Sequence, residues 1–153
     1  MKYDISALGN ALVDTQYMVD HDFLDEIGLE ADSMTLASAE EHSPIIDKLQ
    51  SMGVESVSDC GGSATNSLVA ASYYGSKCHH VCRVANDEDG KKYLESLQKA
   101  GVQHIGYSKE DSEMPTGKCL IFVTPDAKRT MSSMLGISAY LGSKDINLSL
   151  IHI

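Results

Sequence analysis

The sequence has few basic residues and no cluster of them. Its 153 residues include 12 Lys and Arg against 22 Asp and Glu, which gives a formal net charge of −10 at pH 7. Proteins that bind nucleic acids or anionic membranes generally need a basic surface. We therefore expect no nucleic acid and no membrane among its partners.

Long apolar runs are also missing, and a membrane-crossing helix would need about 20 such residues. Residues 1–6 lack the basic-then-apolar pattern of a signal peptide. The spacing of the four cysteines does not indicate a disulfide framework; they are Cys60, Cys78, Cys82 and Cys119. Together these absences predict a cytoplasmic protein with reduced thiols.

What is present is an ordinary globular composition, with 42% hydrophobic and 22% charged residues. Strand patterns alternate with helix patterns, which favours an α/β sheet. The predicted strands of this alternation are residues 3–8, 54–60, 76–84 and 102–107. Further short strands at 12–19 and 33–37 and a hairpin at 118–135 do not fit the alternation. They predict a second, smaller sheet.

One helix start has two interpretations. Ser38 with Glu41 fits a capping box, which would start the helix at residue 39. Ser43 followed by Pro44 fits an N-cap with proline at the first helical position. Because Pro44 would disturb a helix already under way, we expect at least a kink there.

A glycine-rich segment joins a predicted strand to a predicted helix. Gly61 and Gly62 allow a ligand to approach the backbone closely, and the following helix start supplies free N–H groups. Ser63 and Asn66 add polar side chains in the first turn. Such a site suits hydroxyl groups or an anion. The alternative interpretation is a tight turn in which Ser63 merely caps the helix.

A second candidate segment follows the first strand, at the sheet edge where ligands of α/β proteins bind. Asp14 could accept hydrogen bonds from two adjacent sugar hydroxyls, and Asn10 could donate and accept. The alternative is a turn asparagine and a solvated aspartate. The segment is no dinucleotide fingerprint, because a third glycine is missing, and the sequence has no Walker A motif.

In this order, the motifs resemble the ribokinase-like (PfkB) carbohydrate kinase family, and most closely its adenosine kinase branch. The resemblance rests on Gly9-Asn10 with Asp14 and on Gly61-Gly62-Ser63 with Asn66. It continues through Gly75, Asp87 with Gly90, Gly101-Val102, Pro115-Thr116-Gly117 and Arg129-Thr130.

The resemblance implies a three-layer, Rossmann-like α/β sheet with a small β-sheet lid. Residues 1–147 would be the N-terminal portion of such a kinase domain. The lid strands would lie at about residues 12–19, 33–37 and 117–135. Residues 148–153 do not continue the pattern, and we expect them to be a non-native or truncated tail.

The resemblance also implies roles for individual residues. Asn10, Asp14 and the helix start would bind the sugar of a small-molecule sugar or nucleoside; the helix-start residues are Gly61, Gly62, Ser63 and Asn66. Arg129 would lie toward the phosphates. Strand alternation places Met131, Ser133 and Leu135 on the same face as Arg129, and that face would cover the nucleoside base. The alternative for Met131 and Leu135 is lid core.

The sequence departs from the family in one large respect. The family's second signature, Asp-Thr-x-Gly-Ala-Gly-Asp, supplies the anion hole and the catalytic base, and nothing in this chain matches it. We therefore expect no catalytic base here, and ATP and Mg²⁺ sites that lie mostly outside this chain. The expected function is the acceptor-binding half of an ATP-dependent kinase, with adenosine preferred, that is inactive by itself. The alternatives are a non-catalytic binding module or a fragment that forms a homodimer through its lid.

The run Cys78-His79-His80-Val81-Cys82 resembles a metal site, since three of its side chains share one face of a strand. Zinc sites usually need a second ligand pair, and none lies nearby in sequence. We favour a buried strand here and expect no metal.

Replacing Asp14 by alanine tests the predicted acceptor site. Asp14→Ala should abolish binding of adenosine or ribose in a calorimetric titration with little loss of stability, because the residue is expected at the mouth of the site. A variant that unfolds instead would favour a structural role for Asp14.

Overall fold

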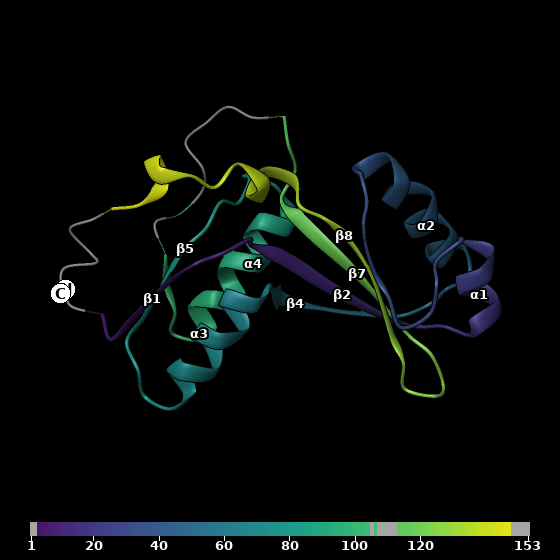
Figure 1. Cartoon of the computed structure of the whole chain (residues 1–153), viewed down its shortest axis with the longest axis horizontal. Coiled ribbons are helices and arrows are strands. Elements are labelled where there is room, and N and C mark those ends of the chain that lie inside the picture. The colour runs from purple at the N-terminus through teal and green to yellow at the C-terminus, as the bar shows by residue number, and fades with distance from the viewer. Residues whose placement is uncertain (1–2, 105, 107–112, 148–153) are drawn as a thin grey trace. The chain divides into compact units, whose positions relative to one another are not determined.

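The computed structural model describes residues 3–104, 106 and 113–147 (Figure 1). These residues form two compact units. The first unit takes its described residues from Met1–Val13, Asp59–Gly117 and Leu135–Ile153. The second unit consists of Asp14–Ser58 and Lys118–Met134. The predicted tail at 148–153 lies outside the described residues.

Strands and helices follow one another much as the sequence predicts. The strands are β1 (Ile5–Leu8), β2 (Leu12–Met18), β3 (Met34–Leu36), β4 (Ser56–Gly61), β5 (Cys78–Val81), β6 (Gln103–His104), β7 (Gly117–Val123) and β8 (Arg129–Met134). The helices are α1 (His21–Glu26), α2 (Ala39–Ser51), α3 (Ser63–Tyr73) and α4 (Glu88–Lys99), with 3₁₀ turns η1 (Gly136–Tyr140) and η2 (Ser143–Asp145). No helix in the described residues is both long enough and apolar enough to cross a membrane.

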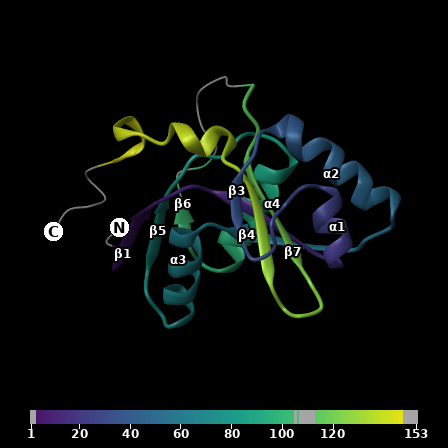
Figure 2. The same cartoon turned by 45° about the vertical axis from the view of Figure 1, so that its right-hand side comes forward.

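The first unit is built on a parallel sheet with the strand order β1-β5-β6. Every residue of the central strand β5 is buried, as expected of a parallel strand between two others. In both cartoon views α3 runs beside β1 and β5 (Figures 1 and 2). The apolar core of this unit consists of Ala11, Val13, Leu68, Cys78, Val84, Tyr93, Leu97 and Val102.

The second unit is built on a sheet with the strand order β3-β8-β7-β2-β4. Strands β7 and β8 form the predicted antiparallel hairpin, and β3 runs parallel to β8. Helices α1 and α2 lie side by side in both views (Figure 2). Their apolar side chains join those of the sheet in a core of Tyr17, Phe23, Leu24, Leu49, Leu120 and Phe122.

The prediction that residues 54–60 belong to the main sheet is wrong. Strand β4 neighbours β2 at the edge of the second sheet. Its first four residues are exposed, in contrast to the buried β5. The segment 56–59 alternates as an edge strand does. This alternation does not indicate which of the two sheets the strand joins.

Helix α2 begins at Ala39, so the alternative start at Ser43-Pro44 is wrong. Both arms of the capping box form: the Glu41 N–H donates to Ser38 Oγ at 3.3 Å, and the Ser38 N–H donates to Glu41 Oε2 at 2.7 Å. Pro44 lies inside the helix. The capping box satisfies donors at the helix start, which favours this start over the later one.

The return strand of the hairpin ends one residue earlier than expected. β8 stops at Met134, and Leu135 has a right-handed helical backbone (φ −73°, ψ −27°) as the N-cap of η1. The expectation that Leu135 shares a strand face with Arg129, Met131 and Ser133 is therefore wrong, because strand alternation no longer applies to it.

Asp87 fastens helix α4 to the segment that precedes β7. Its Oδ1 accepts hydrogen bonds from the Gly90 N–H and from the Thr116 hydroxyl, each at 2.7 Å. Its Oδ2 accepts the Thr116 N–H at 2.8 Å. Burial raises the pKa of Asp87, but the hydrogen bonds from Thr116 and Gly90 outweigh burial and hold this pKa below its ordinary value of 3.8.

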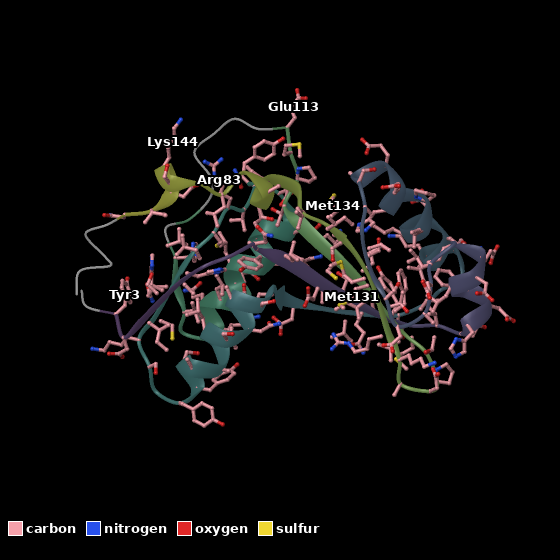
Figure 3. The ribbon with its side chains drawn as sticks, in the orientation of Figure 1. Tyr3, Arg83, Glu113, Met131, Met134 and Lys144 are labelled. Carbon is pink, nitrogen blue, oxygen red and sulfur yellow. The ribbon has the colours of Figure 1, made fainter. Side chains whose placement is uncertain are left out.

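A second fastening in this unit joins Arg83, just after β5, to η2. The Arg83 Nε donates to both carboxylate oxygens of Asp145 at 2.9 Å. The Arg83 side chain is only 7% exposed, so this ion pair is shielded from solvent. Figure 3 shows Arg83 beside the segment that carries η2.

Removing the Asp87 carboxylate should destabilise the protein. Asp87→Ala removes a helix cap and leaves buried Thr116 groups without their acceptor, so the free energy of unfolding should fall by about 2–3 kcal/mol in urea denaturation. Glu95→Ala, on the exposed face of the same helix, is the control and should change stability little. Equal stability of the two variants would contradict the role assigned to Asp87.

Candidate functional site

The turn after β1 lies directly against the start of helix α3. Gly62, the N-cap of α3, has a φ of +98°. A Cβ at Gly62 would lie 2.4 Å from the carbonyl oxygen of Asn10, and a Cβ at Gly9 would lie 2.6 Å from Cβ of Ala64. Both glycines are therefore required by the close approach of these two backbone segments, before any ligand is considered.

Polar groups are exposed around this contact. The side chains of Asn10, Ser63 and Asn66 are all exposed to solvent, whereas Gly61 is buried. The first turn of a helix has N–H groups without intrahelical partners and carries a partial positive charge. The arrangement can bind an anion or the oxygen atoms of hydroxyl groups.

The cap of α3 differs from the caps of the other helices. The side chains of Asp20, Ser38 and Asp87 accept hydrogen bonds from the first turns of α1, α2 and α4. Among the described residues, no side chain caps α3. Ser63 is the first residue of the helix and not its N-cap, so the interpretation of Ser63 as a mere cap is wrong. The N-terminal end of α3 is left accessible.

A buried hydrogen-bonded chain lies beneath this end of α3. The hydroxyl groups of Thr65 and Tyr93 are 2.7 Å apart, and the Tyr93 hydroxyl is 3.1 Å from Nδ1 of His80. All three side chains are essentially inaccessible to solvent. Burial, with smaller contributions from His104 and His79, lowers the pKa of His80 from 6.5 to about 4, so this imidazole is neutral near pH 7.

The remaining predicted site residues lie in the second unit, except Leu135, which belongs to the first. Asp14 is on β2 and half-buried, and Arg129 and Ser133 are on β8. The hairpin register pairs Arg129 with Val123, Met131 with Ile121, and Ser133 with Cys119. Figure 3 shows Met131 on the hairpin. Arg129, Met131 and Ser133 thus share one face of the sheet, opposite to the face that holds Leu120 and Phe122 in the core.

Cys119 belongs to the same face and was missed by sequence reasoning. The Ser133 hydroxyl donates to its Sγ at 3.3 Å. Burial raises the pKa of the Cys119 thiol, the Ser133 hydrogen bond opposes this, Asp14 raises the pKa and Arg129 lowers it. Asp14 and Arg129 therefore both lie close enough to Cys119 to act on it electrostatically. The hairpin register, read from its turn, was the signal that could have placed Cys119 there.

The structure thus groups the predicted residues within each unit. Asn10, Gly61, Gly62, Ser63 and Asn66 gather in the first unit. Asp14, Arg129, Met131 and Ser133 belong to the sheet of the second, whereas Leu135 follows the end of β8.

The histidines of the metal-like run have other partners. Nδ1 of His79 is 3.1 Å from the Ser6 hydroxyl, and the His79 ring stacks on Tyr3 with centroids 4.8 Å apart. His80 bonds to Tyr93. Within the described part of the chain, no three His, Cys, Asp or Glu side chains form a group that could hold a metal ion.

Comparison with known proteins gives one family match. Residues 33–151 match the model of the pfkB family carbohydrate kinases. Among curated proteins, adenosine kinase 1 of Arabidopsis thaliana is 28% identical over 137 residues, which cover 87% of this chain and 38% of that protein. Mouse ribokinase is 30% identical over 88 residues, covering 56% of this chain and 26% of that enzyme.

Solved structures agree in fold. Adenosine kinase from Sinorhizobium meliloti has a TM-score of 0.82 at 29% identity, over 99% of this chain and 45% of that one. A probable sugar kinase from Rhizobium etli CFN 42 has a TM-score of 0.86 at 26% identity, over 98% of this chain and 44% of that one. This chain therefore spans less than half the length of these relatives.

Acid should destabilise the protein through His80. Its pKa is about 4 in the folded protein and 6.5 in its ordinary state, so below pH 6.5 the unfolded chain binds a proton that the native state excludes. The free energy of unfolding should fall as the pH drops from 6.5 to 4, by about 3 kcal/mol from this residue alone. Urea denaturation at stepped pH measures the slope.

The comparison variants for this prediction are His80→Phe and His21→Gln. His80→Phe should reduce the slope between pH 6.5 and 4 without abolishing it, because burial also lowers the pKa values of His42, His79 and His104. His21→Gln alters a histidine whose side chain is 51% exposed and should keep the slope. An unchanged slope in His80→Phe would show that the acid sensitivity arises elsewhere.

Proposed function

The chain belongs to the pfkB family of carbohydrate kinases, and we propose that it is the acceptor-binding part of an ATP-dependent kinase that phosphorylates a hydroxyl group of a sugar or nucleoside. Adenosine is the proposed acceptor. The second unit is the proposed lid over that acceptor, and the chain by itself does not transfer the phosphoryl group.

The observation that carries this proposal is the uncapped start of α3 beside Asn10. Ser63 and Asn66 add hydrogen-bonding side chains to the N–H groups of that first turn. A sugar has adjacent hydroxyl groups, each of which can donate and accept hydrogen bonds. The amide side chain of Asn10 can do both as well, with its nitrogen as donor and its oxygen as acceptor. Asn10, Ser63 and Asn66 are the proposed contacts to the sugar.

The second unit would supply complementary groups. The Asp14 carboxylate can accept hydrogen bonds from two hydroxyl groups and so orient the hydroxyl that reacts. The exposed Arg129 guanidinium can face a phosphate, because its planar donors suit phosphate oxygens. Met131, half-buried on the same face, offers apolar surface to a nucleoside base. The preference for adenosine rests on the adenosine kinases among the relatives, such as that of Sinorhizobium meliloti.

The family uses ATP and Mg²⁺, but among the described residues we assign only one contact to a phosphate and none to the metal. Phosphoryl transfer depends on positioning and on charge stabilisation around the phosphates. No group of metal-binding side chains occurs in the residues that the structure describes, so we assign no step to magnesium in this chain. Arg129 is the one described residue to which we assign a phosphate contact, and no residue is assigned the role of the base.

Two assays on the purified chain test this function. Calorimetric titration with adenosine and with ribose should show binding that Asp14→Ala abolishes. ATP-dependent phosphorylation of adenosine should be absent with the chain alone and should appear when the C-terminal half of the Sinorhizobium meliloti adenosine kinase is added. Binding without restored activity would favour a non-catalytic binding module. Absence of binding to either compound would overturn the proposal.

One observation favours a second candidate function, dimerisation through the sheet of the second unit. Strand β3 is an edge strand, and its Met34 and Leu36 are 57% and 67% exposed. An apolar edge can pair with the same edge of a second copy. Sedimentation velocity over a range of concentrations tests this. A dimer that Leu36→Lys dissociates would support it, and a monomer at every concentration would exclude it.

A further inference from the structure

The buried chain of Thr65, Tyr93 and His80 connects three elements at one point. Thr65 is the third residue of α3, Tyr93 belongs to α4 and His80 to the central strand β5. Their successive distances of 2.7 and 3.1 Å are those of hydrogen bonds. All three elements belong to the first unit. The chain is therefore a direct tie between the first turn of α3 and the interior of that unit.

The same chain extends beneath both backbone segments of the candidate site. Oγ1 of Thr65 lies 3.5 Å from the position that a Cβ of Gly62 would take. Nε2 of His80 lies 3.8 Å from the corresponding position at Gly9. This nitrogen is buried and has no hydrogen-bond partner among the described residues. His80 thus lies next to the Gly9-Asn10 turn and Thr65 next to the start of α3, and Tyr93 connects the two.

The position of this tie matters because α3 has no capping side chain to hold its first turn. A cap both satisfies the terminal N–H groups and fixes the turn. At α3 these two tasks are separated. No side chain covers the Ser63 end of the helix, which is exposed, and the buried Thr65 hydroxyl holds the turn through Tyr93.

We propose that Thr65, Tyr93 and His80 are positioning residues that set acceptor affinity by holding the first turn of α3 in place with its N–H groups unobstructed. None of the three contacts the ligand. This inference rests on the proposed acceptor site, and it adds residues that act on that site through the helix.

The expected effect on affinity comes from removing the Tyr93 hydroxyl, the buried hydrogen-bond partner of Thr65 and His80. Tyr93→Phe keeps the ring and removes the hydroxyl, which leaves the Thr65 hydroxyl and His80 Nδ1 without their shared partner. Unsatisfied buried groups relax by shifting or by admitting water, and either response moves the first turn of α3. Because hydrogen bonds to a ligand weaken steeply with poor geometry, acceptor affinity should fall about tenfold.

A pair of substitutions at Thr65 separates positioning from packing. Thr65→Val keeps the shape of the side chain and removes its hydroxyl, so it should retain most of the stability and bind adenosine about tenfold more weakly. Thr65→Ser keeps the hydroxyl and removes a buried methyl group, so it should lose stability and retain affinity. A merely structural role would make affinity follow stability in both variants.

Amide hydrogen exchange gives a readout that needs no ligand. In Tyr93→Phe and Thr65→Val, exchange should accelerate at residues 66–68, whose N–H groups bond to carbonyl groups of the first turn, and stay unchanged at residues 70–73 of the same helix. Tyr17→Phe removes the hydroxyl of a buried tyrosine in the second unit and is the matched control, which should change neither exchange nor affinity.

The outcomes distinguish the two proposals. If the wild-type chain binds neither adenosine nor ribose but the two variants accelerate exchange at residues 66–68, the proposed function fails and the tie to α3 stands. If exchange at those residues is unchanged in both variants, the positioning inference is overturned. Unchanged affinity in Thr65→Val, with wild-type binding intact, would overturn it as well.

Discussion

The close approach of two backbone segments at Gly62 and Asn10 is the constraint on which the first unit depends. Neither Gly9 nor Gly62 leaves space for a side chain, because one would meet Ala64 and the other the Asn10 carbonyl oxygen. The contact places a turn after β1 and the start of α3 at the same sheet edge, where ligands of α/β proteins bind. The same close approach therefore constrains the packing of the first unit and brings the residues of the candidate site together.

Much of this arrangement could be predicted from the sequence, because it is local. Gly61 and Gly62 between a strand and a helix are a signal contained within a few residues. The same is true of Asn86 and Asp87 as alternative caps of α4, of which the structure uses Asp87. The edge strand β4 and the end of β8 before Leu135 could not be predicted in the same way. Sheet membership and strand ends depend on neighbours distant in sequence, which local patterns do not contain.

The functional side chains also differ in whether the sequence alone could identify them. Exposed polar residues in glycine-rich turns, such as Asn10 and Ser63, stand out in the sequence because turns need no such side chains for packing. Tyr93 looks like an ordinary apolar position of helix α4, and its hydroxyl gains meaning only when Thr65 and His80 are placed beside it. Buried polar networks link residues far apart in the chain, so their members do not form a motif.

The hairpin of the second unit carries a further consequence for sequence variation. Its register assigns Arg129, Met131 and Ser133 to one face and Thr130 and Ser132 to the other. The turn between the strands closes through a hydrogen bond from Thr124 N–H to the Lys128 carbonyl and includes Ala127 with a φ of +63°. Because side chains alternate with a period of two, deleting one residue of this turn would exchange the two faces of β8. The length of this turn therefore determines which side chains of β8 lie on each face of the sheet. A change of one residue in the turn would alter the chemistry of both faces.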